Sequence, residues 1–137
     1  MTRYILDSNA VNQFIERRPA FQRRVVAARQ LGCRIGTCEP VVAELYYGLE
    51  FSSSKATNLI RLQDGLRKLR SWPFDRAAAW QYGRIAADLK RAGRPMQIID
   101  MMVAAIAVSV GNIVVVSSDT DLLAVPGLAV ENWAAEQ

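Results

Sequence analysis

Residues 113–119 read IVVVSSD, and this stretch decides the fold. Its four β-branched residues form a strand without polar alternation, as expected when both faces of a parallel sheet are covered. Directly before them, residues 98–110 form an almost uniformly apolar helix that ends at Gly111. Such a helix must be central in the fold, because it has no polar face to turn toward water. The strand is followed by the polar residues Ser117, Ser118 and Asp119.

The same alternation of strands and helices continues outward along the chain. Further strands are predicted at residues 4–6, 34–37, 72–74 and 128–133, the last of them at an edge of the sheet. Cap, proline and glycine signals predict helices over residues 7–17, 19–32, 39–48 and 75–93, and an amphipathic helix after Ser54. This order predicts an α/β fold, a three-layer α/β/α sandwich with a mostly parallel five-stranded sheet. We expect residues 1–137 to form a single domain.

Composition excludes several kinds of chemistry. The chain contains no histidine, which excludes a Ser-His-Asp triad, a Cys-His pair and a histidine-ligated zinc site. Its two cysteines, Cys33 and Cys38, lack metal-ligand and redox spacing, and we expect them to be core thiols. Any catalysis must therefore use carboxylates, hydroxyls or a metal ion.

The N-terminus and the apolar segments indicate a cytoplasmic protein. Asp7 follows too soon after the start for a signal peptide. The most apolar stretch, residues 101–116, is shorter than the roughly 18 residues of a membrane span. We therefore expect no contact with a membrane.

Acidic residues stand where a parallel sheet places its ligands. Asp7 and Asp119 follow two strands, and ligands of open parallel sheets bind beyond the carboxyl ends of strands, where strand order reverses. Asp100 begins the apolar helix, and Glu44 lies in a short helix after the second strand. Carboxylates brought together repel one another unless a cation joins them. Oxygen ligands without histidine favour Mg²⁺, with Mn²⁺ as the alternative.

Each acid also has a purely structural interpretation. Asp7 can be a helix N-cap, and Asp100 a first-turn charge that complements the helix dipole. Asp119 and Asp121 can be turn residues, the more so Asp121, and Glu44 a solvated helix position.

The cations suit a phosphate-rich partner. Fourteen of the 17 basic residues are arginine, whose planar group of donors matches phosphate. Four of them surround the predicted break between the first two helices: Arg17, Arg18, Arg23 and Arg24. A pI of about 9.4 is also common among small domains, so this evidence alone does not decide between nucleic-acid binding and no special role.

Five segments, in order, resemble motifs of PIN-domain ribonucleases. Residues 6–9 (LDSN) resemble the family's opening motif, and residues 42–48 (VAELYYG) its acidic helix. Residues 93–105 (GRPMQIIDMMVAA) resemble the segment that carries the third acid, and residues 116–119 (VSSD) the last acidic motif. Residues 125–133 are similar to the tail of many VapC toxins. Each motif is weak singly, but their order over nearly the whole chain is a strong signal.

The resemblance implies a Mg²⁺-dependent endoribonuclease toxin that is a homodimer and is neutralised by a VapB-like antitoxin. It implies an RNA substrate, with tRNA as one candidate class. Carried over residue by residue, the catalytic and metal-holding acids are Asp7, Glu44, Asp100 and Asp119. Ser8, Asn9, Ser117 and Asp121 would lie beside them, and the four arginines are candidate contacts for RNA or antitoxin. The spacing around Asp121 is compressed relative to the family, so either Asp119 or Asp121 can be the outer ligand, with Asp119 favoured.

Two other functions compete with this interpretation. One is a PIN-like module that binds RNA or protein without cutting, against which the four intact acids argue. The other is an aspartate-based phosphotransfer domain. Its known types need a lysine at a strand end or an Asp-x-Asp motif at the first strand, and the chain has neither.

Overall fold

The structure is a computed structural model that describes residues 2–134. Its centre is a five-stranded sheet in the order β3-β2-β1-β4-β5, in which every neighbouring pair is parallel. The strands are β1 (Arg3–Leu6), β2 (Arg34–Cys38), β3 (Arg70–Trp72), β4 (Ile113–Val116) and β5 (Ala129–Glu131). The predicted parallel α/β sheet is confirmed, and β5 lies at an edge as expected. The expected domain limits at residues 1 and 137 fall outside the described residues.

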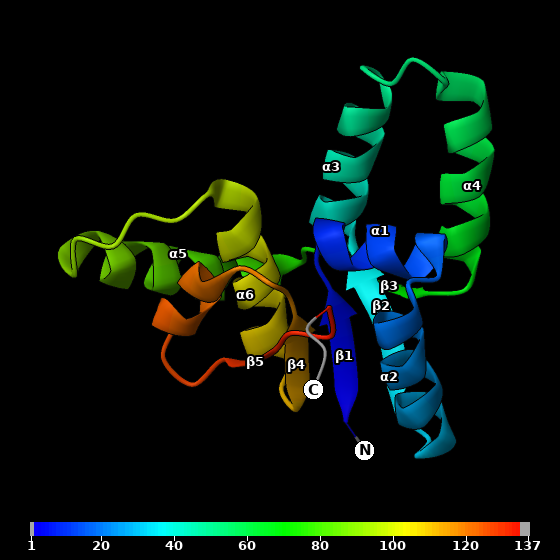
Figure 1. The fold of residues 1–137 in the computed structure, drawn as a ribbon. Coiled ribbons are helices and arrows are strands. Elements are labelled where there is room, and N and C mark those ends of the chain that lie inside the picture. Colours follow the sequence, from blue (N-terminus) through cyan, green and yellow to red (C-terminus); the bar gives the residue numbers. More distant parts are fainter. Residues whose placement is uncertain (1, 135–137) are drawn as a thin grey trace.

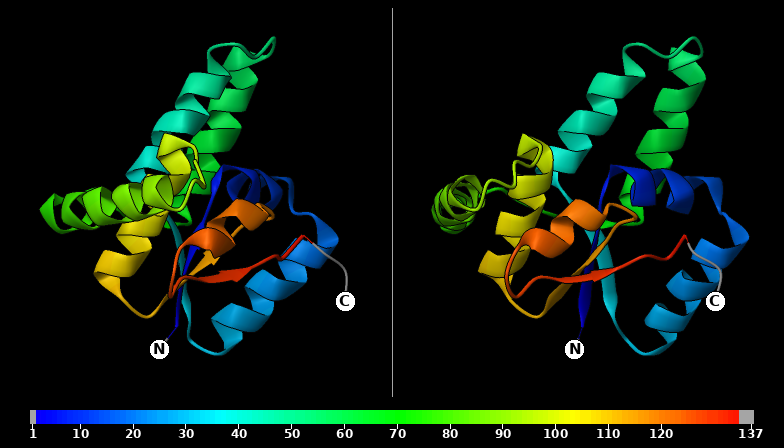
Figure 2. Two further views of the ribbon diagram at one scale, coloured as in Figure 1. Left: turned by 90° about the vertical axis from the view of Figure 1, so that its left-hand side faces the viewer. Right: turned by 60° about the vertical axis from the view of Figure 1, so that its left-hand side comes forward.

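Helices cover both faces of the sheet (Figures 1 and 2). On one face lie α1 (Ser8–Glu16) and α2 (Pro19–Gln30), and on the other α5 (Arg76–Arg91) and α6 (Ile98–Val110). The pair α3 (Glu39–Leu49) and α4 (Lys55–Arg67) extends beyond the carboxyl edge of the sheet, at the top of Figure 1. A short 3₁₀ helix, η1 (Thr120–Ala124), lies in the connection between β4 and β5. None of the helices within residues 2–134 has the length and apolar character needed to cross a membrane.

The strand order reverses between β1 and β4. The chain moves outward from β1 to β2 and β3, then returns through α5 and α6 to place β4 on the other side of β1. The Asp7 backbone N–H donates to the Val116 carbonyl oxygen over 3.1 Å, so the ladder continues one residue past β1. Openings at such a reversal lie between diverging helices, which makes the carboxyl edge of β1 and β4 the natural ligand position.

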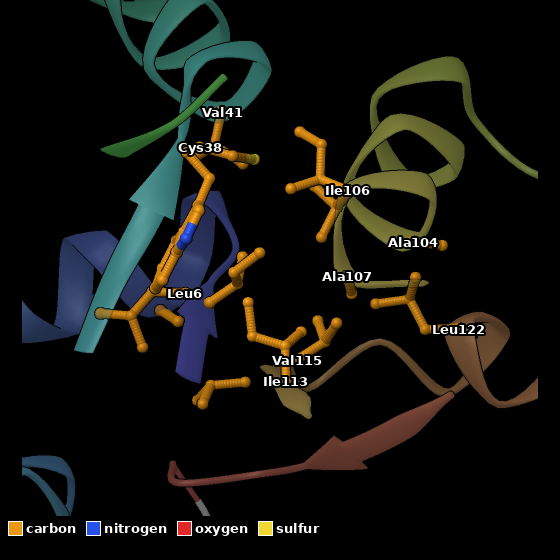
Figure 3. Close-up of a cluster of buried hydrophobic side chains, with 14 of the residues drawn as sticks. Leu6, Cys38, Val41, Ala104, Ile106, Ala107, Ile113, Val115 and Leu122 are labelled. Carbon is orange, nitrogen blue, oxygen red and sulfur yellow. The ribbon is translucent and has the colours of Figure 1, made fainter. Parts of the chain in front are cut away.

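Helix α6 and strand β4 form the middle of the hydrophobic core. Residues 103–107 of α6 are all buried, and three of these five are alanines, so the helix approaches the sheet closely. Figure 3 shows Ile106 and Ala107 directed toward side chains of β1, β2 and β4. Val115 and Val116 are both buried although they face opposite sides of the sheet. This double coverage explains the uniformly apolar sequence of β4.

Two strands differ from their predicted bounds. The third was expected at residues 72–74 but ends at Trp72, because Pro73 has no N–H to donate to the ladder. The last was expected over residues 128–133 but pairs only from Ala129 to Glu131. Beyond it, the Trp133 ring is buried and packs against Tyr4 and Phe21, with centroids 4.9 and 5.5 Å away.

Both cysteines are free thiols, as expected. Cys38 is fully buried, and this burial raises its pKa to about 12. Cys38 is therefore a packing residue without nucleophilic reactivity at neutral pH.

Candidate metal centre at the carboxyl edge of the sheet

Four acidic side chains from distant parts of the chain line one cavity of about 140 Å³. They are contributed by the end of β1, by α3, by the first turn of α6 and by the segment after β4: Asp7, Glu44, Asp100 and Asp119. Ser8 and Asn9 also line the cavity, as predicted, and apolar contacts come from Val41, Ile99 and Val103. The cavity lies at the reversal of strand order described above.

Asp7 both starts α1 and faces the cavity. Its backbone is extended, and its Oδ1 accepts a hydrogen bond from the Ala10 backbone N–H over 2.9 Å. The side chain is 7% exposed. The structural interpretation as an N-cap is thus correct, and it does not exclude a role in the site, because a carboxylate has lone pairs left for a ligand.

Asp119 and Asp121 take different positions. The Asp119 carboxylate lines the cavity, and its Oδ1 accepts the Asp121 backbone N–H over 2.9 Å. Asp121 itself is exposed and does not line the cavity. The buried Ser117 hydroxyl accepts the Asp119 backbone N–H over 2.9 Å, which orients the turn. Of the two candidate outer ligands, only Asp119 faces the other acids.

Glu44 reaches the cavity from the α3 side. It is half-buried, and its Oε1 accepts a hydrogen bond from the Ser8 hydroxyl. Ser8 is the first residue of α1, so this bond joins α1 to α3 through two residues that lie 36 positions apart in the sequence. Glu44 is therefore not a freely solvated helix position.

Burial and neighbouring charges raise the pKa of two of the acids, Asp7 and Asp100. Burial raises the pKa of Asp7, and the charges of Asp119 and Glu44 raise it further, while hydrogen bonds from Ser117 and Ala10 oppose the shift. Burial also raises the pKa of Asp100 to about 6, together with the charges of Asp119, Asp7 and Glu44. Near neutral pH the negative charges of these carboxylates repel one another, and a bound cation would relieve that repulsion.

The donors fit a hard divalent cation. All the charged groups are carboxylates, which suit Mg²⁺ or Mn²⁺. Within residues 2–134, no three acidic or thiol side chains are already grouped closely enough to ligate one ion directly. Mg²⁺ commonly keeps several waters and takes one or two carboxylates directly, so the other acids would reach the ion through its waters. The cavity of about 140 Å³ has room for such waters, since each occupies about 30 Å³ in the liquid.

The four predicted contact arginines do not share one environment. Arg17 lines a cleft between α1, α2 and α4. Arg18 pairs with Glu16 over 2.8 Å, and Arg24 lies 3.9 Å from the Glu131 carboxylate of β5. Arg23 is exposed on α2. The structure thus separates the cluster that the sequence suggested, and its contact with RNA or antitoxin stays a prediction.

Sequence reasoning missed two features around the site. Gln97, the residue before α6, lines the carboxylate cavity, and its position just ahead of the apolar helix was the one available signal. A larger groove of about 580 Å³ continues from Ser8 and Glu44 between α1, α3 and α4, and it includes Asn12 and Arg61. No local pattern marks this groove, because it forms only when α4 packs beside α1.

Comparisons with known proteins point to one family. The family model of the PIN domain matches residues 4–128. The chain is 32% identical over 134 residues to a tRNA(fMet)-specific endonuclease VapC of Shigella flexneri, covering 98% of this chain and 100% of that one. It is also 32% identical to Ribonuclease VapC2 of Haemophilus influenzae, with 97% and 99% covered. The solved structure of DNA-bound VapBC from Salmonella typhimurium superposes with a TM-score of 0.87 at 27% identity, over 97% of this chain and 99% of that one.

Proposed function

The chain belongs to the PIN-domain family, as one of its VapC-type ribonucleases, and from this premise we propose that it hydrolyses RNA phosphodiesters with a divalent metal ion at its carboxylate cavity. One observation carries the proposal: acids separated by up to 112 residues, Asp7 and Asp119 among them, line a single small cavity. We propose Mg²⁺ as the ion, with Mn²⁺ as a substitute.

The residues proposed to hold the metal ion are Asp7, Glu44, Asp100 and Asp119, one or two of them directly and the others through waters bound to the ion. When bound, the ion would orient and acidify a water and stabilise the charge that develops on the phosphodiester. Ser8 holds Glu44 through its hydroxyl, and Ser117 supports the turn that presents Asp119. These two serines are positioning residues.

The protonation of the acids matters before any ion is bound. Burial and the neighbouring charges favour a proton on Asp100, whose pKa is raised to about 6. That proton must leave before the carboxylate can act as a ligand. The protein thus offers a site that takes up a cation more readily as the pH rises past this value.

The partners follow from the same membership. The Salmonella typhimurium relative was solved as a VapBC complex, and we propose that a VapB-like antitoxin neutralises this chain. The Shigella flexneri relative is a tRNA(fMet)-specific endonuclease, which makes tRNA a candidate substrate here. We further propose that residues 1–137 act as one PIN-like unit, as a homodimer, in the cytoplasm where the RNA substrate is found.

The test is cleavage of RNA by the purified protein free of antitoxin. We expect cleavage of tRNA with Mg²⁺, loss of cleavage in EDTA, and recovery when Mg²⁺ or Mn²⁺ is added back. A sample with Asp100→Asn is the matched control against a contaminating nuclease. Cleavage that persists in EDTA contradicts the metal mechanism, and RNA binding without cleavage supports the non-catalytic module.

A further inference from the structure

A second polar cleft, of about 270 Å³, lies at the far end of α1 from the carboxylate cavity. It is formed where α1, α2 and α4 meet, at the right-hand side of Figure 1. Four cations line it: Arg17, Arg29, Arg61 and Lys68. The one acid in its lining, Asp64, accepts a hydrogen bond from Arg67 over 2.6 Å. The cleft is therefore strongly positive.

The four cations are available to a ligand. None of the four forms a salt bridge with a carboxylate within residues 2–134. Arg29 is held in place, since its guanidinium donates to the Lys68 carbonyl oxygen over 3.3 Å and lies 5.6 Å from the centre of the Phe14 ring. An anchored guanidinium loses less freedom on binding an anion than a free one.

The cleft is continuous with the proposed catalytic site. The carboxylate cavity shares Ser8 and Glu44 with the groove of about 580 Å³, and that groove shares Ile15 and Arg61 with the basic cleft. Arg17, the C-cap of α1, stands nine positions after Ser8, which corresponds to a rise of about 13 Å along the helix axis. At about 3.4 Å per nucleotide of a stacked strand, this is a span of about four nucleotides.

Close packing of two helices shapes the cleft. A Cβ atom on Gly65 of α4 would lie 2.4 Å from Ile15 Cγ1 of α1, so only glycine allows this approach. Arg17, at the end of α1, has a left-handed backbone with φ of 53°, a conformation that favours glycine. Its side chain lines the cleft from that position.

We propose that the basic cleft binds backbone phosphates of the RNA strand, about four nucleotides away from the phosphodiester at the carboxylate cavity. This inference rests on the proposed function. Arginine recognises phosphate through paired donors, and the groove provides a continuous path from the carboxylate cavity to these arginines. The groove itself has carboxylates of Glu16 and Glu44 and one cation, so the phosphate contacts concentrate at its basic end.

The test compares two triple variants with equal loss of charge. The cleft variant carries Arg17→Gly, Arg61→Gln and Lys68→Gln, in which glycine suits the left-handed backbone at position 17 and so preserves the fold. The control carries Arg76→Gln, Arg84→Gln and Lys90→Gln on exposed positions of α5, across the sheet. Thermal unfolding of both confirms that they are folded.

Affinity for a single-stranded RNA of about 12 nucleotides is measured in EDTA between about 50 and 200 mM salt, conditions in which counterion release is readily detected. In the cleft variant we expect the slope of log affinity against log salt to fall in magnitude by about 2, since each lost phosphate contact removes about 0.7. The control should keep the slope of the unmodified protein. In Mg²⁺, the cleft variant should raise KM and leave kcat nearly unchanged.

Other outcomes overturn the proposal. Equal slopes in the two variants would mean that only total charge matters. An unchanged RNA slope with weakened binding to the antitoxin would assign the cleft to an acidic peptide. In both cases the unmodified protein still cuts RNA, so the proposed function survives. If the unmodified protein neither binds nor cuts RNA, the proposed function fails, and the cleft inference fails with it.

Discussion

The Ser8 hydroxyl donates a hydrogen bond to Glu44 Oε1, and through it the first turn of α1 holds a carboxylate of α3 at the cavity. Ser8→Ala removes this support while leaving all four acids in place. We expect the affinity for Mg²⁺ to fall by about tenfold, as for other residues that orient a metal ligand, with a loss of stability of about 1 kcal/mol. Mg²⁺ titration of cleavage and urea unfolding measure the two effects. An unchanged Mg²⁺ dependence would mean that the Ser8 hydrogen bond does not orient a metal ligand.

One pair of variants separates the N-cap role of Asp7 from its proposed role at the metal ion. Asp7→Asn keeps an N-cap acceptor for the Ala10 N–H but removes the charge, so cleavage should be lost without the cost in stability of losing the cap. Asp7→Ala should also lose cleavage and cost about 1 kcal/mol in unfolding free energy, because α1 loses its cap. If the asparagine variant cleaves RNA normally, Asp7 is only a cap.

The raised pKa of Asp100 predicts a stability that depends on pH. In the folded chain this pKa is about 6, against 3.8 for the free group, so the folded state binds the proton more tightly. Stability contributed by the protonated acid is present below about pH 4 and is lost as the pH rises through about 6. Asp100→Asn should therefore be more stable than the unmodified protein at pH 8 in EDTA.

The expected gain for Asp100→Asn is about 1 kcal/mol after allowance for solvent screening, and it should vanish at pH 4. Urea unfolding at the two pH values measures it. Added Mg²⁺ should reverse the order at pH 8, because the ion stabilises the carboxylate cluster and not the asparagine variant. Equal stability at both pH values would mean that Asp100 is not under repulsion.

Asp119 and Asp121 are distinguished by their different exposure. Asp119→Asn should lower cleavage by at least about tenfold through weaker metal binding, whereas Asp121→Asn should leave it unchanged. Both variants lose one charge, so each is the control of the other. The reverse result would assign the outer ligand to Asp121.

Contact between α1 and α4 predicts opposite effects for two glycines. Gly65→Ala places a methyl group against Ile15 and should cost about 1 to 3 kcal/mol through overpacking. Gly83→Ala lies on α5, with no atom within 4 Å of the new methyl group, and should add about 0.5 to 1 kcal/mol through helix propensity. Chemical denaturation measures both. A stabilising Gly65→Ala would show that the helices separate easily.

Local signals were sufficient for the acids beside strands. Asp7 and Asp119 each follow a run of apolar residues, and the carboxyl ends of parallel strands share one edge, so their convergence could be predicted. Asp100 could be predicted because its helix is too apolar to lie at the surface. These signals lie in residues next to each acid, so they can be detected in one sequence without a structure.

Two features could not be predicted because they depend on packing between distant segments. They are the separation of Arg17 from Arg24 and the groove beside α1. Arg17 and Arg24 lie seven residues apart, yet one faces α4 and the other β5. Arg17 lines the cleft because α4 packs closely against α1. That packing depends on the contact between Gly65 and Ile15, which lie fifty residues apart in the sequence. The choice between Asp119 and Asp121 was decided in the same way, by which side of a turn faces the other acids.

By itself, the sequence determined the alternation of strands and helices, the parallel sheet and the identity of the acids, since these follow from periodicity and from the chemistry of single residues. Only the tertiary structure decided which of Asp119 and Asp121 lines the cavity and which cations line a cleft. The physical reason is that a site is a set of distances between segments, and those distances are set by close packing in the core.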